Sequence, residues 1–355
     1  MKKEAGVIAI AGLLLLGATG FLLQHINTTP MLLPWLLAAA LCWALVMQQF
    51  YSRLDLNRAA VDTDPYPDLG LANALTLVRG WMIAATCGFL LIKVPSVALI
   101  WIAAAFYSVA AILDRVDGWI ARLTRRSSLL GAELDTVFDA LGLLIAPLLA
   151  LKLGKIHPAY LLVSVAYYLF VLGIYRRKRR GAPVYPLHPS SLRRTLAGFQ
   201  MAYVAVVLWP PFDARYTVLA GFGFMVPLLT GFVVDWLAVS GRISMQHNST
   251  QKVFSALHNT SQAIALPLLR ITTALLLLLI ADNAWLWLLA AMLATGLAAR
   301  FSAMTVLIVL AWTAPQLSSA VLVLLFASIL LLLLGSGSYS LWNADDDWVN
   351  RQDGA

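Results

Sequence analysis

The stretch DRVDGWIARLTRRSSLLGAELDTVFD, residues 114–139, places four aspartates in a chain that is otherwise largely apolar. Asp114 and Asp117 stand three residues apart, and Asp135 and Asp139 stand four apart, so each pair lies on one face if its segment is helical. The polar residues between the two pairs are numerous enough to turn one helix back against the next. We therefore predict that the four carboxylates converge at one face of a membrane.

Carboxylates gathered in this way repel one another and are costly to hold near lipid unless a cation accompanies them. Hard divalent cations such as Mg²⁺ and Mn²⁺ prefer oxygen ligands. The four aspartates therefore predict a divalent metal site.

The spacing of the stretch is D-x-x-D-G-x-x-A-R, eight residues, then G-x-x-x-D-x-x-x-D, and it resembles the signature of the CDP-alcohol phosphatidyltransferase family. All of its motif positions are present: Asp114, Asp117, Gly118, Ala121, Arg122, Gly131, Asp135 and Asp139. The alternative is a polar loop that snorkels between two membrane helices. Such a loop needs neither the small residues nor the two carboxylate spacings.

A second motif, LANALTLVRGW, begins at residue 71. Asn73, Thr76 and Arg79 fall at i, i+3 and i+6, within an arc of roughly 120° on a helix. The motif is similar to the N-x-L-T-x-x-R pattern that opens the first core helix in the same family, where it helps to hold the cytidine nucleotide. Ala72 stands where the family usually has proline. The alternative is an asparagine helix cap with a snorkelling arginine.

Composition excludes a soluble globular domain, because 61% of the 355 residues are hydrophobic and 12% are charged. The net charge of +8 comes from basic residues in short loops. These are topology signals and contacts to phosphate or anionic lipid, so no nucleic-acid partner is expected. Cys42 and Cys87 lie in apolar runs and form no metal or disulfide pattern.

We expect an all-α fold, a polytopic transmembrane helical bundle in which a six-helix transferase core carries extra membrane helices at both ends. Its expected parts are two N-terminal helices and a cytoplasmic linker over 1–70, the core over 71–242, a linker over 243–263 and a four-helix region with a polar tail over 264–355. The basic, then apolar start is interpreted as a retained first helix rather than as a signal peptide.

Apolar runs of suitable length predict the individual helices. They cover 7–24, 31–49, 71–92, 96–113, 129–152, 157–175, 196–209 and 216–239, followed by 264–281, 284–299, 302–313 and 319–334. With Lys2 and Lys3 inside, the aspartates fall on the same side as the basic cluster at 176–180. We expect a multi-pass protein of a bacterial-type inner membrane, with its active site facing the cytoplasm.

The resemblance implies transfer of a phosphatidyl group from a CDP-linked lipid, most simply CDP-diacylglycerol, to an alcohol acceptor in phospholipid biosynthesis, with release of CMP. It gives Asp114, Asp117 and Asp135 to Mg²⁺ or Mn²⁺, as two ions. Asp139 is the implied general base and can also contact a metal. The remaining residues that it assigns to the nucleotide or CDP-lipid are Asn73, Thr76, Arg79, Gly118, Ala121, Arg122 and Gly131.

The acceptor stays open, since glycerol 3-phosphate, inositol phosphate, serine and free alcohols are all used in this family. Arg193 and Arg194 stand at the start of a core helix, where members acting on phosphorylated acceptors often place basic residues. They favour a phosphorylated acceptor such as glycerol 3-phosphate. Asp235 is expected to pair with a loop arginine such as Arg242. Dimers are common in the family, so a homodimer is a further option.

Two alternatives belong to other classes. A cation transporter with an aspartate cage would place its carboxylates near the bilayer midplane, in broken helices. The C-terminal helices also resemble DoxX-like membrane proteins, through an LLR start that contains Arg270 and a G-x-G-x-x-S-L ending, and they could carry the main role. Arg270 is a functional-site candidate or a residue that snorkels from an early helix turn.

Overall fold

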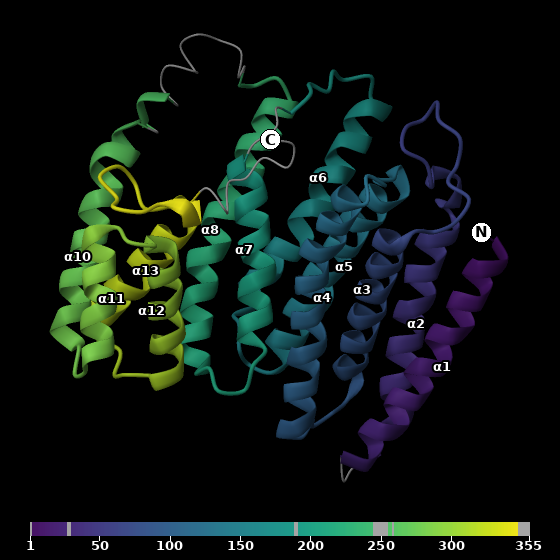
Figure 1. Cartoon of the computed structure of the whole chain (residues 1–355), viewed down its shortest axis with the longest axis horizontal. Helices are drawn as coiled ribbons and strands as arrows, with labels where there is room; N and C mark the ends of the chain where they lie inside the picture. Colours follow the sequence, from purple (N-terminus) through teal and green to yellow (C-terminus); the bar gives the residue numbers. More distant parts are fainter. Residues whose placement is uncertain (1, 27–29, 188–190, 244–254, 258, 347–355) are drawn as a thin grey trace. The chain divides into compact units, whose positions relative to one another are not determined.

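The computed structural model describes residues 2–26, 30–187, 191–243, 255–257 and 259–346. Over these residues the chain is helical and contains no strand (Figure 1), and an isolated bridge joins Leu297 to Trp342. The prediction of an all-α polytopic bundle is confirmed.

Helices that are long and apolar enough to cross a membrane recur between Lys3 and Ile280. Within the described part there are 8 of them, over Lys3–Ile26, Leu32–Tyr51, Leu71–Leu91, Val97–Leu123, Leu129–Lys152, Pro158–Arg179, Ala214–Val239 and Ser255–Ile280. Large apolar side chains such as Leu14, Leu33 and Leu41 stay more than half exposed on them, as they would against lipid. The chain is a multi-pass integral membrane protein.

The helices keep the order in which the apolar runs appear in the sequence. They are α1 Lys2–Ile26, α2 Leu32–Tyr51, α3 Leu71–Gly88, α4 Val97–Leu123, α5 Leu129–Lys152, α6 Leu161–Arg179, α7 Ser191–Val207, α8 Ala214–Val239, α10 Leu266–Ile280, α11 Ala284–Thr295, α12 Ala299–Thr313 and α13 Ser319–Leu334. Short helical turns stand at Leu54–Leu56, Phe89–Leu91, Pro158–Tyr160 and Ser261–Ala265.

Helix α4 differs most from its predicted extent, because it continues to Leu123 instead of ending at residue 113. Hydropathy falls at Asp114, but backbone hydrogen bonding does not depend on hydropathy and the following residues include good helix formers. The helix ends where Arg125 adopts a left-handed φ of 51°. The Arg126 amide then donates to the Ala121 carbonyl at 2.9 Å, which closes a Schellman motif.

The chain divides into two compact units. The first comprises Met1–Ser164 and Met201–Pro210, and the second comprises Val165–Gln200 and Pro211–Ala355. Each unit therefore contains part of the segment that the sequence predicts to be the transferase core.

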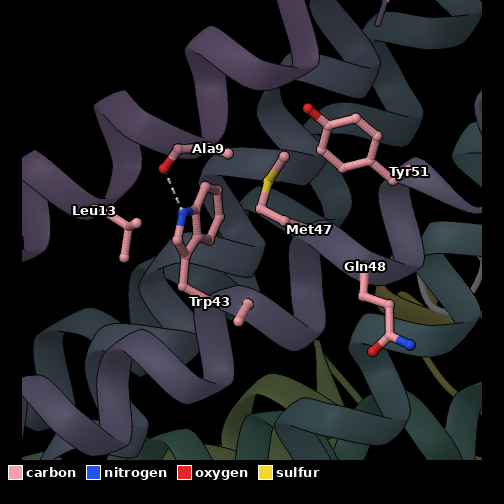
Figure 2. Close-up of a pocket in the computed structure, with 7 residues that line it drawn as sticks. Ala9, Leu13, Trp43, Met47, Gln48 and Tyr51 are labelled. Carbon is pink, nitrogen blue, oxygen red and sulfur yellow. Dashed lines mark hydrogen bonds between the residues drawn. The ribbon is translucent and has the colours of Figure 1, made fainter.

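In the first unit α3 packs against α2, α4 and α5. Its buried residues include Leu77, Trp81 and Ile83, and the Trp81 indole donates to the Gly12 carbonyl of α1 at 3.1 Å. A second indole ties α1 to α2, where Trp43 donates to the Ala9 carbonyl at 3.0 Å (Figure 2). Beside this bond lies an open, largely apolar cavity of about 320 Å³, lined by Ala9, Leu13, Trp43, Ala44, Met47, Gln48 and Tyr51.

In the second unit α8 packs against α12 and α13, while α10 to α13 contact one another in turn. Arg270 does not snorkel, since it is 3% exposed and donates to the carbonyls of Ser336 and Tyr339. It anchors the segment after α13. Arg300 is also buried and is paired with Asp346. Of the predicted linker 243–263, residues 244–254 and 258 lie outside the described part of the chain.

Candidate active site

The site residues occupy matching heights on three neighbouring helices. With a rise of about 1.5 Å per residue, Asn73, Thr76 and Arg79 stand about 3, 8 and 12 Å into α3. By the same rise, Asp117 and Asp114 stand about 9 and 14 Å before the end of α4, and Asp135 and Asp139 about 9 and 15 Å into α5. The three polar residues of α3 therefore make three levels of contact with α4 and α5.

The innermost level gathers three of the four aspartates. Ligand oxygens of Asp114, Asp135 and Asp139 all lie within 4.8 Å of one another. Their side chains are 22%, 47% and 38% exposed, respectively. The cluster is therefore partly buried and still reachable from outside.

Arg79 provides the positive charge within this cluster. Its side chain is 0% exposed, and its Nη1 lies 2.7 Å from Asp114 and 2.6 Å from Asp135. Its Nη2 contacts Asp139. Three carboxylates around one guanidinium leave a formal excess of two negative charges.

The middle level joins Thr76 to Asp117. The threonine hydroxyl donates to Asp117 Oδ2 at 2.8 Å, and both residues are buried. Asp117 therefore lies one turn of α4 away from Asp114 and outside the group of three carboxylates.

The outermost level joins Asn73 to the start of α5. Ser128 caps this helix by accepting from the Gly131 amide at 3.0 Å, and its hydroxyl donates to Asn73 Oδ1, also at 3.0 Å. A Cβ at Gly131 would stand 2.8 Å from that oxygen, so glycine permits the close approach of the two helices.

The small residues of α4 leave its backbone accessible. A Cβ at Gly118 would meet only Arg122 Nη1, at 3.6 Å, and Gly118 itself is partly exposed. Ala121 is partly exposed too, and Arg122 is exposed. This stretch of α4 presents backbone and a guanidinium to its surroundings.

Arg193 and Arg194 lie in the first turn of α7, in the second unit. Arg193 Nε pairs with Asp235 Oδ2 at 2.9 Å, while Arg194 is exposed. The expected pairing of Asp235 with Arg242 was wrong, because Arg193 on the neighbouring helix lies within ion-pair distance.

The donor set fits a divalent cation. Carboxylate oxygens are ligands of the kind that Mg²⁺ and Mn²⁺ prefer. With Arg79 counted, the cluster of Asp114, Asp135 and Asp139 has an excess of two negative charges, which equals the charge of one such ion. The three side chains are exposed enough to receive it.

Sequence reasoning missed two residues of this end of the bundle. Ser128 belongs to the stretch that is expected to form only a turn, although serine before an apolar run is a helix-start signal. Asn57, which is 1% exposed, accepts from Asn73 Nδ2 at 3.0 Å. It lies in a stretch that was interpreted as a linker, and no local pattern distinguishes it there.

The site combines carboxylates, a buried arginine and small residues on packed membrane helices. This combination is that of an integral-membrane enzyme with an acidic active site. Residues 69–240 match the sequence model of the CDP-alcohol phosphatidyltransferase family. This region belongs to that family, whose members are transferases of substituted phosphate groups. It is a membrane phosphotransferase that uses a CDP-alcohol. Searches of curated proteins and of solved structures found no match.

Proposed function

We propose that the protein moves the phosphatidyl group of CDP-diacylglycerol to a small alcohol in phospholipid biosynthesis and releases CMP. The observation that carries this proposal is the group of three carboxylates around Arg79 within the matched region. An anionic pyrophosphate can approach such a group only when cations neutralise it.

Asp114, Asp117, Asp135 and Asp139 would hold two Mg²⁺ or Mn²⁺ ions. Bound there, the ions would supply charge neutralisation for the pyrophosphate and the departing CMP. The formal charge of the cluster supports one of these ions, and the position of Asp117, one turn from Asp114, supports its part in holding the second. Arg79 forms ion pairs with three of these carboxylates and thereby holds them in place.

Asp139 is the proposed general base, positioned by its contact with Arg79. It takes the proton of the acceptor hydroxyl while that oxygen forms a bond to the phosphorus that bears the lipid. The bond from this phosphorus to the bridging oxygen breaks, and CMP leaves with that oxygen. Its partial exposure, 38%, supports access by a polar acceptor.

The nucleotide end of the donor is proposed to lie along α4. The open backbone at Gly118 and Ala121 admits close approach by a phosphate, and Arg122 provides a planar cationic partner for it. The proposed contribution of α3 and α5 to this subsite is to position its helices. Thr76 positions α4, and Asn73 and Gly131 position the start of α5.

We propose a phosphorylated acceptor such as glycerol 3-phosphate. Arg194 is the better candidate for its phosphate, because Arg193 is engaged by Asp235. The site is proposed to face the cytoplasm of a bacterial-type inner membrane, in line with the basic residues that end α6. The transferase core is proposed to extend over 71–242, between the N-terminal and C-terminal parts, and the protein is proposed to form a homodimer.

A cation transporter is the weaker alternative. Helices α4 and α5 run without a break through all four aspartates, whereas a transport site of that kind uses discontinuous helices.

The acceptor proposal is tested by CMP release from CDP-diacylglycerol across a panel of phosphorylated and free alcohols. We expect a phosphorylated acceptor to stimulate release, and Arg194→Gln to raise its KM about tenfold through loss of one charged hydrogen bond. Arg180→Gln, which removes an exposed arginine after α6, is the matched control. A free alcohol as best acceptor, or an unchanged KM in Arg194→Gln, would contradict this assignment.

A further inference from the structure

The segment between α2 and α3 is built into the end of the bundle that carries the aspartates. Asn57 is 1% exposed, although it lies in a polar stretch rich in Asp and Pro. Its Nδ2 donates to the Asp68 carbonyl at 2.9 Å, and its Oδ1 accepts from Asn73 at 3.0 Å. A buried amide with a donor and an acceptor both engaged holds its surroundings in one arrangement.

These bonds continue without interruption to the start of α5. The Gly131 amide donates to Ser128, Ser128 donates to Asn73, and Asn73 donates to Asn57. Every step is 3.0 Å long and every donor points the same way along the chain of bonds, so the bonds polarise one another.

A second set of contacts runs beside the first. The Leu129 amide donates to the Arg58 carbonyl at 2.9 Å, which fixes the first residue of α5 against the residue after Asn57. Tyr66 donates to the Ser127 carbonyl at 3.2 Å, and Arg126 pairs with Asp68 at 2.7 Å. The turn between α4 and α5 is therefore held from outside the two helices that it joins.

Together these contacts of Asn57, Arg58, Tyr66 and Asp68 hold the start of α5. This helix presents Asp135 and Asp139, which stand about 9 and 15 Å into it. A shift or rotation at the first turn of a rigid helix is carried to both carboxylates. We infer that Asn57 is a positioning residue, which sets the placement of the α5 carboxylates through Asn73 and Ser128. It lies outside residues 69–240, so the family match does not assign it.

The inference rests on the proposed metal site and is tested with Mn²⁺ alone. Asn57→Asp keeps the shape but removes the donor and sets a carboxylate against the Asp68 carbonyl. Ala59→Asp adds the same charge at an exposed position of the same segment and is the control. Free Mn²⁺ would be measured by electron paramagnetic resonance on monodisperse protein in detergent. Hydrogen exchange of the amides at 129–134 would be measured without metal.

We expect Asn57→Asp to weaken Mn²⁺ binding about tenfold and to speed exchange at 129–134, with Ala59→Asp unchanged in both. Ser128→Ala should weaken Mn²⁺ binding by a similar factor. The double variant should bind Mn²⁺ as tightly as the weaker-binding of the two single variants, because both changes break one chain of bonds. Additive losses, or wild-type binding in Asn57→Asp, would overturn the inference.

If Asn57→Asp does not fold, Asn57→Ser replaces it, since the shorter side chain cannot reach both the Asp68 carbonyl and Asn73. We expect a two- to threefold loss of Mn²⁺ affinity, and no loss would overturn the inference. Absence of Mn²⁺ binding in the unsubstituted protein would count against the proposed metal site instead. The exchange at 129–134 would then decide the role of Asn57 by itself.

Discussion

Arg79 lies wholly buried between Asp114, Asp135 and Asp139 and supplies the counter-charge without which these side chains would repel one another. A guanidinium suits this position because its planar fork carries several donors on one fixed frame. A divalent cation at the same carboxylates would take over part of this electrostatic work.

We therefore expect Arg79→Gln to destabilise the metal-free protein by about 3 kcal/mol, the range for breaking a buried ion pair from one side. The loss should be smaller with Mn²⁺, because the cation screens the remaining carboxylates. Thermal unfolding in detergent, with chelator and with Mn²⁺, measures both values.

Arg115→Gln is the control, since Arg115 is exposed on α4 beside Asp114. An equal fall of the unfolding midpoint with chelator and with Mn²⁺ would show that Arg79 serves packing only.

At the scale of the helices, two glycines have different roles. Gly131 permits close packing of two helices, and Gly118 leaves the backbone of α4 accessible to a ligand. A methyl group at Gly131 would stand 2.8 Å from Asn73 Oδ1, whereas one at Gly118 would meet only Arg122 at 3.6 Å. We expect Gly131→Ala to lower the unfolding midpoint and to reduce activity more than tenfold. Gly118→Ala should keep the midpoint and raise the KM for CDP-diacylglycerol, because only a bound ligand meets the added methyl group.

Midpoints and KM values of the two variants, measured side by side, check this contrast. A Gly118→Ala protein with unchanged KM would show that no ligand approaches this part of α4, and a destabilised one would show that Gly118 serves packing.

The sequence predicts which residues share a face of a helix, but it does not predict how deeply those residues are buried. The spacing of Thr76 and Arg79 predicted a shared face of α3, and both point to the aspartate helices. It could not show that Arg79 is wholly buried, because burial depends on which helices pack around α3. The end of α4 was misplaced because hydropathy falls at Asp114 while the helix continues.

Contacts between distant segments could not be predicted from the sequence for a different reason. Asn57 meets Asn73 across a segment without regular periodicity, and Arg270 meets Ser336 across most of the C-terminal region. Both are single polar residues whose partners are selected by tertiary packing. Nothing in their neighbouring sequence records those partners.

At the scale of the whole molecule, α12 and α13 of the C-terminal region are packed onto α8. The Tyr216 hydroxyl donates to the Pro315 carbonyl at 2.6 Å, and the Asp213 amide donates to the Ala311 carbonyl at 2.8 Å. Ile329 of α13 is fully buried, and its side chain fills the space above Gly223. These contacts make the C-terminal region part of the structural support of α8.

A chain cut after Ile243 should therefore unfold at a lower temperature than the full protein and should aggregate more readily in detergent, because the packed face of α8 is uncovered. Size-exclusion chromatography and thermal unfolding measure both effects. Leu279→Ala, which trims a side chain that is 78% exposed on α10, should leave both unchanged. A truncated protein with the midpoint of the full chain would mean that the C-terminal helices fold independently of α8.

Metal-dependent transfer at the aspartate cluster is tested by CMP release from CDP-diacylglycerol by purified protein in detergent. We predict release that requires Mg²⁺ or Mn²⁺ and one alcohol acceptor, and that falls at least a hundredfold in Asp135→Asn, because a metal ligand is lost. CMP release that persists in Asp135→Asn, or that is indifferent to a chelator, would contradict the account.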